Sequence, residues 1–406
     1  MVTVGAASMR ATERRTRLGV KRSIRICARH APAPTDVSMH IGLFTTVFPP
    51  QVGGMERFAE DLARGLHGMG HRVTVVGPKH VPGGQEVDAA LPFRVVRDTR
   101  AHVQLEALRG VDVVHVNGNS LRGIGLAQLA RRPLVITHSA WQALCPSAMI
   151  WSPRGECTAD ARHPGPCSTC LHQGPRAALA TRAHRAGPML AGANIAISRF
   201  MEQRLGLPRC LTIYNPVADR AFEARSPGPG DADTVVFAGR LVQEKGLGSL
   251  LHALVHLPQV QLEVVGDGPL RGQLQGLAGA LGIALRVTWH GTLPFPALAN
   301  AYARAAVVCA PSALEEPFGY AVAEAMAMER PVVATRRGAF TEMLTDDRGW
   351  LAPPGDVSAL ASALGEALSS PTERLRRAAR ARAFAVSEFR MEPLLRRHVD
   401  LYQRVA

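Results

Sequence analysis

The chain has 406 residues, of which 47% are apolar and 20% charged, as is ordinary for a soluble globular protein with room for two domains. No apolar run reaches the roughly 18–20 residues of a membrane-spanning helix, and the first residues lack a signal-peptide core, so we expect a cytoplasmic protein. Of the net charge of +14, residues 1–38 contribute +6, and the remaining +8 suits anionic ligands or an anionic membrane surface. An aromatic content of 5% without interleaved basic stripes does not indicate nucleic-acid binding.

Residues 1–38 differ from the rest of the chain. They hold eight basic and two acidic side chains and show little periodicity. We expect a basic, disordered arm here, and the alternative is that translation begins at Met39.

From Met39 onward, strand patterns alternate with helical patterns. Strands are expected at 40–47, 72–77, 111–118 and 133–139, and helices at 53–70 and 120–131. Strands separated by helices indicate a parallel, doubly wound sheet. We therefore assign residues 39–215 to an N-terminal Rossmann-like domain.

A Pro/Gly-rich stretch at 216–233 interrupts this alternation, and we interpret it as a linker. The alternation then restarts, with strands expected at 234–239, 260–266, 285–291, 305–311 and 330–335. This predicts a second Rossmann-like domain at 234–385, followed by a C-terminal helix at 386–406 that could return to the first domain. The expected fold class is α/β, with two doubly wound parallel sheets facing across a cleft and ligands at the carboxyl ends of the strands.

Two glycine turns follow predicted strands. "QVGGMER" (51–57) places Gly53 and Gly54 before the first helix, and "VVGDGPL" (264–270) places Gly266 and Gly268 before another. Glycines let the backbone approach a ligand closely, and a helix N-terminus offers N–H groups to an anion. Each turn alone is a weak signal, because many such glycines serve only packing.

"FAGRLVQEKGL" (237–247) is a stronger signal. Arg240 directly follows a strand, and Lys245, one of three lysines in the chain, precedes a glycine and a helix. Two cations on one strand-end loop suit a diphosphate, since arginine offers a planar fork and lysine a point charge. The alternative is an ordinary solvated loop.

"EEPFGYAVAEAMA" (315–327) brackets an aromatic, a glycine and an apolar run with Glu316 and Glu324. Phe318 and Gly319 are expected to open a helix whose N–H groups can donate to sugar hydroxyls or phosphate. Glu324 is flanked by Ala, Val and Met, so we expect a buried, partnered carboxylate, able to accept from both hydroxyls of a ribose. The alternative is a helix-start acid at Glu316 and a surface residue at Glu324.

Together these motifs resemble the retaining glycosyltransferases of family 4, with the E-x7-E motif and the GT-B fold, over residues 39–400. The resemblance implies that Arg240 and Lys245 hold the donor diphosphate, and that Glu316 with the Phe318–Gly319 backbone holds the donor sugar. It also implies that Glu324 binds the nucleotide ribose.

The remaining turns acquire roles from the same resemblance. Gly53 and Gly54 would close on the donor phosphate or the acceptor in an N-terminal acceptor-binding domain, and Gly266 with Gly268 would wall the nucleotide pocket. His138, in "VITHSAW", matches the histidine that such enzymes place near the donor sugar. A satisfied core histidine is the alternative for His138, as it is for His115 and His290.

The resemblance implies transfer of a sugar from a nucleotide-sugar donor with retention, in which the leaving phosphate takes the acceptor proton and no metal is required. "DAD" (231–233) matches a metal-binding pattern, but it lies in the predicted linker and we interpret it as chance. The expected donor is UDP-N-acetylglucosamine or UDP-glucose, with GDP-mannose not excluded. A soluble aminocyclitol of antibiotic biosynthesis, an envelope glycan and a lipid-linked acceptor all remain open.

Two other functions compete with this prediction. A hydrolysing UDP-sugar 2-epimerase shares the architecture, but it needs acids for proton abstraction beyond Glu316 and Glu324. A basic nucleic-acid-binding protein would leave both glutamates unexplained.

The stretch at 144–172 is a cysteine-containing insert. Cys167 and Cys170 form a CxxC pair that could hold a structural zinc ion, with Cys145 and Cys157, or His163 or His172, completing the four ligands. Reduced cysteines without metal are the alternative.

A basic stretch with some apolar residues follows at 176–191. It could contact the inner membrane face that carries a lipid-linked acceptor, whereas a solvated helix is the alternative.

Overall fold

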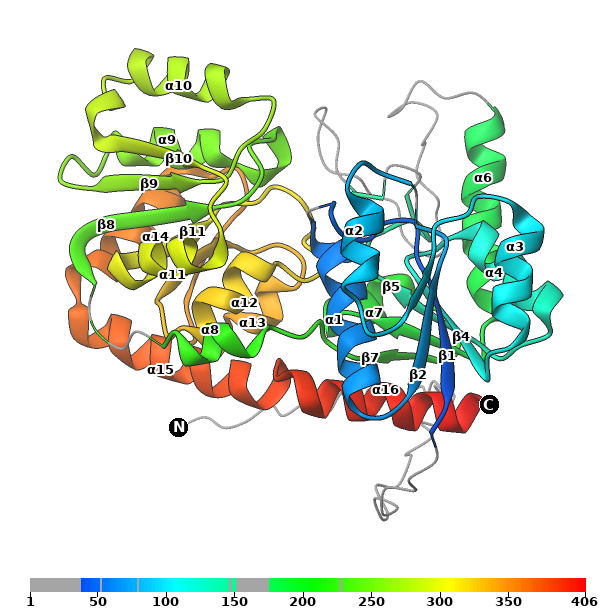
Figure 1. Ribbon diagram of the computed structural model, residues 1–406. Helices are drawn as coiled ribbons and strands as arrows, with labels where there is room; N and C mark the ends of the chain where they lie inside the picture. Colours follow the sequence, from blue (N-terminus) through cyan, green and yellow to red (C-terminus); the bar gives the residue numbers. More distant parts are fainter. Residues whose placement is uncertain are drawn as a thin grey trace, which may run out of the picture. The chain divides into compact units, whose positions relative to one another are not determined.

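The computed structural model describes residues 38–51, 53–78, 80–145, 148–150, 175–225, 228 and 230–406. Residues Ser38–Ala406 make one compact unit. Two parallel sheets organise this unit, each with helices on both faces (Figure 1). The predicted α/β class with two doubly wound sheets is therefore confirmed.

The first sheet has seven parallel strands among the described residues, in the order β3-β2-β1-β4-β5-β6-β7. They are β1 (His40–Phe44), β2 (Arg72–Val76), β3 (Arg94–Val96), β4 (Val113–Asn117), β5 (Leu134–His138), β6 (Ala193–Ala196) and β7 (Cys210–Thr212). Runs such as VVHVN in β4 are buried throughout, as is typical of a parallel sheet covered on both faces. The sequence prediction missed β3, β6 and β7, because strands of three or four residues carry too little pattern.

The helices of this region alternate with its strands. They are α1 (Gly54–Gly68), α2 (Gly84–Ala89), α3 (Ala101–Arg109), α4 (Leu121–Ala130), α6 (Pro175–Ala186), the short 3-10 helix η1 (Gly187–Leu190) and α7 (Arg199–Leu205). Helix α1 buries Phe58, Leu62 and Leu66, so its apolar face packs on the core while its opposite face stays polar.

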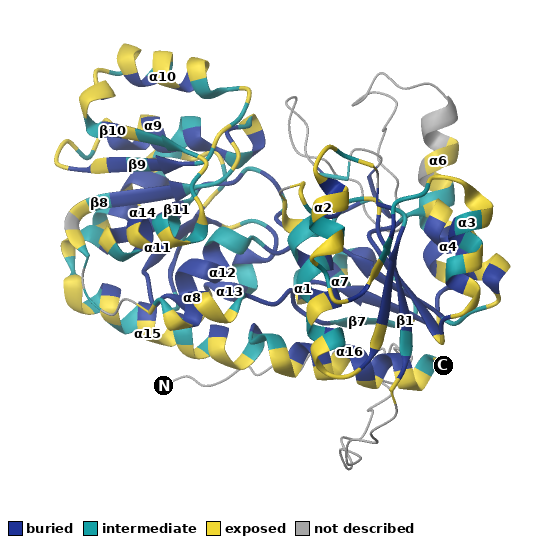
Figure 2. Ribbon diagram, viewed as in Figure 1, coloured by how far each residue is buried: buried dark blue, intermediate teal, exposed yellow. Residues whose placement is uncertain are grey.

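The second sheet has six parallel strands in the described part of the chain, in the order β10-β9-β8-β11-β12-β13. They are β8 (Asp231–Ala238), β9 (Gln261–Val265), β10 (Val287–Gly291), β11 (Ala305–Ala310), β12 (Val332–Thr335) and β13 (Trp350–Ala352). Their central members are buried, whereas the outer helices expose one face (Figure 2). In each sheet, successive strands are added first to one side and then to the other, and the direction reverses at a switch point. The switch point lies between β1 and β4 in the first sheet and between β8 and β11 in the second.

The elements around the second sheet follow the same alternation. They are α8 (Asp219–Glu223), η2 (Gln243–Lys245), α9 (Leu247–Leu254), α10 (Arg271–Ala280), η3 (Ala284–Arg286), α11 (Phe295–Arg304), α12 (Tyr320–Ala327), α13 (Phe340–Met343), α14 (Val357–Ser369), α15 (Pro371–Glu388) and α16 (Met391–Val405).

The predicted linker at 216–233 needs correction. It contains helix α8, and Asp231 to Asp233 begin β8, where Asp231 pairs with Ala305 of β11. Asp231 and Asp233 are exposed at the start of the strand, so their carboxylates stay hydrated. Polar residues can therefore occupy these strand positions, although their composition indicated a linker. "DAD" is thus part of a strand.

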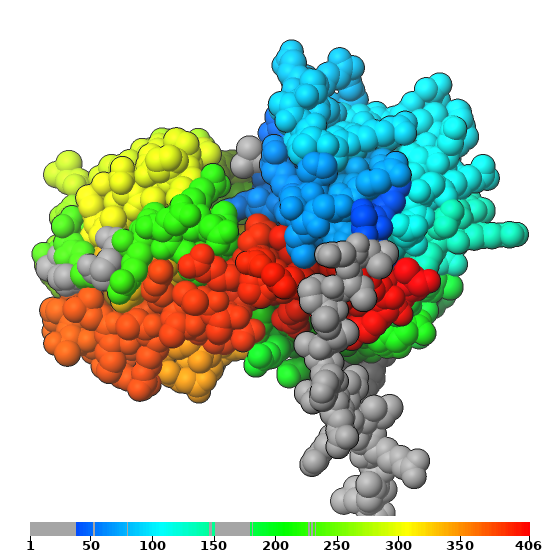
Figure 3. All heavy atoms as spheres, turned by 60° about the horizontal axis from the view of Figure 1, so that its bottom comes forward, coloured from blue at the N-terminus to red at the C-terminus, as the bar shows by residue number. Residues whose placement is uncertain are grey.

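The last two helices span both sheets' regions. Helix α16 packs against α1 and β5, and its Tyr402 contacts His115 of β4 at a ring-centroid separation of 5.7 Å. Figures 1 and 3 show α15 and α16 following each other end to end along one face of the molecule. The C-terminal segment thus returns to the first sheet.

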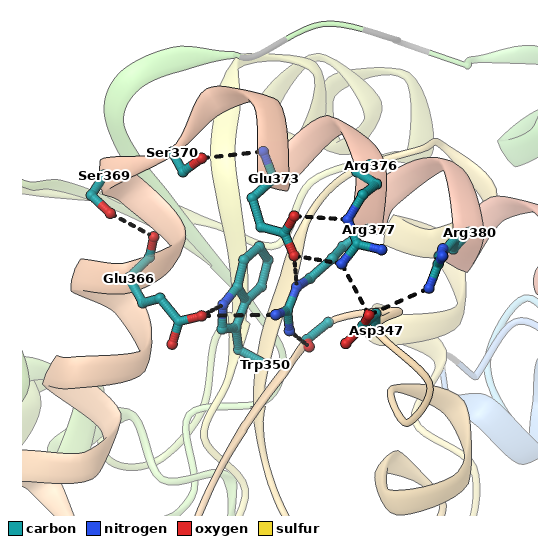
Figure 4. Close-up of polar contacts among 10 residues, drawn as sticks. Asp347, Trp350, Glu366, Ser369, Ser370, Glu373, Arg376, Arg377 and Arg380 are labelled. Carbon is teal, nitrogen blue, oxygen red and sulfur yellow. Dashed lines mark hydrogen bonds and ion pairs between the residues drawn. The ribbon is translucent and has the colours of Figure 1, made fainter.

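Helix α15 is fastened by an exposed charge network (Figure 4). Glu373 accepts hydrogen bonds from Arg377 at 2.7 Å and from Arg376, and Arg376 also bonds to Asp347 at 3.0 Å. Such solvent-exposed pairs contribute little each, so the main anchor of α15 is its buried face.

Candidate functional site

Loops from two neighbouring strands meet at the switch point of the second sheet. Lys245 lies in the loop after β8, and Glu316 lies in the loop after β11. The Lys245 Nζ atom is 2.6 Å from Glu316 Oε1, and the same oxygen accepts a hydrogen bond from the Ser312 hydroxyl at 2.7 Å. Open α/β sheets bind ligands at such a switch point, so this ion pair marks a candidate site.

The loop after β8 is also held to its neighbour through the backbone. The Glu244 carbonyl accepts from the Ala313 N–H at 2.9 Å and from the Leu314 N–H at 3.3 Å. Arg240 remains 70% exposed, with its Nη2 3.6 Å from Glu244 Oε1. The structure thus fixes the loop while leaving one guanidinium open to an anion.

The glycine turn after β9 is explained by packing. Gly266 has φ +128, and a Cβ there would lie 1.9 Å from the Gly239 carbonyl oxygen. A Cβ on Gly268 would lie 2.5 Å from the Leu241 carbonyl oxygen. Both glycines let this turn pack on the loop that carries Arg240, and their contact with a nucleotide stays a prediction.

Helix α12 begins at Tyr320, with Gly319 as its N-cap at φ +90. A Cβ on Gly319 would lie 2.3 Å from the Phe340 ring, so this sharp turn requires glycine. Phe318 is buried against Tyr320 and Phe389. These contacts fix the direction of the helix N-terminus directly after Glu316.

Glu324 is buried inside α12, with 5% of its surface exposed. Its Oε1 accepts a hydrogen bond from Arg57 Nη1 of helix α1. The expectation of a buried, partnered carboxylate is confirmed, and the alternative of a surface residue is wrong.

The first glycine loop reaches the same region. Gly53 precedes α1 in an extended conformation, and a Cβ on Gly54 would lie 3.2 Å from the Tyr320 ring. A larger residue at position 54 would therefore hold α1 away from α12. The structure brings this loop next to the start of α12, while its closure on phosphate or acceptor stays a prediction.

His138 ends β5 and is fully buried. Its Nε2 lies 3.0 Å from Asn194 Oδ1, and its Nδ1 has no hydrogen-bond partner among the described residues. Burial lowers the pKa of His138 to about 4, so the imidazole is neutral at pH 7. A neutral ring offers a hydrogen bond rather than a charge, and its proximity to a donor sugar stays a prediction.

The other two histidines of the sequence analysis have structural partners. His115 is buried, with Nδ1 2.6 Å from the Tyr402 hydroxyl and Nε2 2.7 Å from Thr137 Oγ1. His290 Nε2 lies 3.0 Å from Glu263 Oε2. The structural alternative fits both.

Sequence reasoning missed three contributors to this region: Arg57, Ser312 and Trp141. The indole N–H of Trp141, which follows β5, donates to the Glu315 carbonyl at 2.7 Å. Arg57 lies in the same helical turn as Gly54, so its closeness to the glycine loop could have indicated that it belongs to the site. The partners of Trp141 and Ser312 had no local signature.

The zinc prediction falls largely outside the described residues. Cys157, Cys167 and Cys170 lie there, as do His163 and His172, whereas Cys145 is buried in the described part. Within the described ranges, no group of three or more His, Cys, Asp or Glu side chains is arranged to hold a metal ion. Structural zinc stays a prediction.

Helix α6 covers part of the basic stretch at 176–191. Leu179 on α6 and Met189 and Leu190 on η1 are exposed. No helix in the portion that the structure describes is both long and apolar enough to cross a membrane. Contact with a membrane surface stays a prediction.

The arrangement of the two sheets is that of a known fold. It matches the solved structure of HepE from Anabaena with a TM-score of 0.72 and 20% sequence identity, over 90% of this chain and 100% of the other. This likeness shows the fold, which is the GT-B fold of glycosyltransferases.

The family follows from two matches along the chain. Residues 52–219 match the model described as Glycosyltransferase Family 4, and residues 219–384 match that described as Glycosyl transferases group 1. The chain therefore belongs to glycosyltransferase family 4.

Curated relatives agree in part of their length. The chain is 32% identical to the lipopolysaccharide core biosynthesis glycosyltransferase LpsE of Rhizobium meliloti, over 44% of this chain and 52% of the relative. It is 38% identical to the D-inositol 3-phosphate glycosyltransferase of Xylanimonas cellulosilytica, over 41% of each. The matched region thus spans about half of the length of these relatives.

Proposed function

We propose that the protein is a retaining glycosyltransferase that moves a sugar from a nucleotide-sugar donor to an acceptor hydroxyl. One observation carries this proposal: Lys245 and Glu316 pair at 2.6 Å across the switch point of the second sheet, beside the exposed Arg240. A cation, a carboxylate and an open guanidinium on fixed loops suit a diphosphate that carries a sugar. A purely structural ion pair would not require the open arginine.

The charges fit the bond that breaks. Cleavage of the sugar–phosphate bond leaves negative charge on the diphosphate, and cations placed beforehand stabilise that charge as it develops. Arg240 and Lys245 would supply them. Lys245 is already oriented by Glu316, so little reorganisation is needed when the donor binds.

The two glutamates would hold the ends of the donor. Glu316 is buried and rigidly bonded, so its second carboxylate oxygen would accept from a hydroxyl of the donor sugar. Glu324 would accept from the nucleotide ribose, and Phe318 with Gly319 would present backbone N–H groups at the start of α12.

Gly53 and Gly54 would face the phosphate or the acceptor from the first domain. His138 would offer its unpaired Nδ1 to a hydroxyl, and Gly266 with Gly268 would border the base.

The proposed donor is UDP-glucose or UDP-N-acetylglucosamine. HepE, which shares the fold, was solved in complex with UDP and with UDP-glucose. That likeness is one of fold at 20% identity, so it supports a uridine nucleotide without excluding GDP-mannose.

The acceptor belongs either to antibiotic biosynthesis, as an aminocyclitol, or to an envelope glycan. Of the two curated relatives, one is named for a cyclitol phosphate and the other for the lipopolysaccharide core, so they support a cyclitol acceptor and an envelope glycan respectively. We propose a cytoplasmic location, and a lipid-linked acceptor would bring the protein to the inner membrane face. Flotation of the protein with anionic vesicles would test whether it binds the membrane surface, as a lipid-linked acceptor requires.

Calorimetric titration with UDP, GDP, UDP-glucose, UDP-N-acetylglucosamine and GDP-mannose, with and without EDTA, tests the proposal. We expect saturable, metal-independent binding of one nucleotide family. The absence of binding to all five ligands would overturn the proposed donor site. Once an acceptor is found, the anomeric configuration of the product, read by NMR, decides between retention and inversion.

A further inference from the structure

Four charged or polar side chains from two helices meet between the sheets. Arg57 and Asp61 come from α1, and Tyr320 and Glu324 come from α12; we refer to these four residues as the α1–α12 polar cluster. Arg57 Nη1 donates to Glu324 Oε1, and Arg57 Nε lies 3.6 Å from Asp61 Oδ2. The guanidinium carbon of Arg57 lies 5.3 Å from the centroid of the Tyr320 ring. Arg57 thus contacts every other member of the cluster.

The cluster is buried but incompletely bonded. The Glu324 side chain is 6% exposed and the Arg57 side chain 25%. Three buried atoms have no hydrogen-bond partner among the described residues, namely Arg57 Nη2, Asp61 Oδ2 and the Tyr320 hydroxyl. Native proteins rarely leave such atoms unpaired, and here three occur in one group.

The electrostatics favour a persistent charge pair. Burial lowers the pKa of Arg57, but the Glu324 carboxylate, together with Tyr320 and Asp61, offsets this, so the guanidinium pKa is raised overall. Burial raises the pKa of Asp61, and Arg57 opposes that rise. Arg57 therefore stays charged, and its strongest partner is Glu324.

The hydrogen bond from Arg57 makes the two oxygens of the Glu324 carboxylate inequivalent. Oε1 is taken by Arg57, whereas Oε2 accepts no hydrogen bond from the part of the chain that the structure describes. A carboxylate on a helix can rotate about its last torsion, and a fixed donor on one oxygen removes that freedom. The free oxygen is then held in one direction.

We infer that Arg57 is a positioning residue for the nucleotide ribose. It holds Glu324 so that Oε2 accepts from the ribose hydroxyls, and this inference rests on the proposed donor site. Because Arg57 belongs to the helix that follows Gly53 and Gly54, the first domain takes part in ribose recognition through a residue that does not touch the reacting atoms.

The test compares ribonucleotides with their 2′-deoxy forms by calorimetry on the full chain. The ligands are UDP, GDP, 2′-deoxy-UDP, 2′-deoxy-GDP and inorganic pyrophosphate. The variants are Arg57→Met, Arg57→Lys and Glu324→Gln. Arg64→Met is the matched control, because Arg64 lies on the same helix and pairs with Glu60 on an exposed surface.

We expect the wild type to prefer the ribonucleotide by about tenfold or more, as a charge-assisted hydrogen bond allows. Arg57→Met should lose most of this preference while keeping pyrophosphate affinity, and Arg57→Lys should recover part of it. If Arg57→Met does not fold, Arg57→Gln, whose side chain is polar but uncharged and too short to replace the guanidinium, should show the same loss. Arg64→Met should match the wild type.

Two results would overturn the inference alone. One is a folded Arg57→Met protein with the full ribose preference while Glu324→Gln has lost it. The other is a loss of affinity in Arg57→Met that is equal for ribonucleotide, deoxynucleotide and pyrophosphate, which indicates a merely structural role. A wild type that binds no nucleotide would instead overturn the proposed function and this inference with it.

Discussion

Lys245 and Glu316 are 71 residues apart in the chain, yet their side chains meet at 2.6 Å. They meet because β8 and β11 are neighbours in the second sheet although two strands separate them in sequence. The doubly wound topology thus brings a cation and a carboxylate to one edge. Both side chains are mostly buried, at 25% and 6% exposure, so the pair is less screened than a surface salt bridge.

Replacing Lys245 by Ala should lower kcat/KM for transfer by about 10²–10³-fold, because one prepositioned cation is lost from the developing diphosphate charge. Steady-state kinetics with the donor identified by calorimetry would measure this. The Ser312 hydroxyl still bonds Glu316 in the variant, so the fold should be kept.

Arg380→Ala is the control for that variant. Arg380 is an exposed cation on α15, paired with Asp347 at 3.4 Å (Figure 4). Its removal changes the net charge equally and should leave kcat/KM within about twofold. Equal losses in both variants would show that only net charge matters and would contradict the assigned site.

Trp141→Phe should lower the free energy of unfolding more than Trp350→Phe does. Both indoles are buried and each donates one hydrogen bond. Trp141 bonds the Glu315 carbonyl, which would lose its partner, whereas Trp350 bonds Glu366, whose side chain is 63% exposed and can turn to water. We expect a difference of about 1–2 kcal/mol, measured by urea unfolding. Equal losses would mean that the ring volume, and not the hydrogen bond, decides.

The strand ends and the motif residues could be predicted because their signals are local. An apolar strand pattern followed by a glycine or an arginine predicts both the strand and the loop after it. This is how Gly53 and Arg240 could be assigned to strand-end loops. The contacts between the two sheets' regions could not be predicted this way. Arg57 and Glu324 are 267 residues apart, and Trp141 and Glu315 are 174 apart, so only the folded chain reveals these partners.

The short edge strands were missed for a different reason. Three residues such as Arg94–Val96 do not complete two alternations, and their strand state depends on pairing with β2. The polar start of β8 was missed for the same reason. Its composition indicated a linker, but Asp231 pairs with Ala305 of β11 and is therefore strand.

Gly266→Ala and Gly272→Ala should change stability in opposite directions. Gly266 has a positive φ and no space, since the new Cβ would lie 1.9 Å from the Gly239 carbonyl oxygen. Gly272 lies in α10 with no atom within 4 Å of its Cβ position, so alanine there should stabilise the helix by about 0.5–1 kcal/mol. Thermal unfolding of both variants measures the two shifts. A neutral Gly266→Ala would show that the turn can adopt another conformation.

Stability should fall on mild acidification, partly because of His398. This histidine is buried in α16, stacked at 5.9 Å on His115, with Nδ1 2.8 Å from the Leu394 carbonyl. Burial lowers its pKa to about 4, compared with 6.5 in the unfolded chain. Below pH 6.5 the unfolded state therefore binds a proton that the native state does not, and stability is lost from about pH 6.5 down to about pH 4.

His398→Phe removes this group while keeping an aromatic ring in contact with Phe58. His138 titrates in both proteins. His115 keeps the main cause of its lowered pKa, which is burial, and loses only the smaller effect of His398, so the difference between the proteins reports chiefly on position 398. Between pH 7 and pH 5, the wild type should lose about 2 kcal/mol more unfolding free energy than the variant, since each unit of pKa shift is worth about 1.4 kcal/mol. Urea unfolding at several pH values measures both curves. Parallel curves would mean that His398 is hydrated or protonated in the native protein.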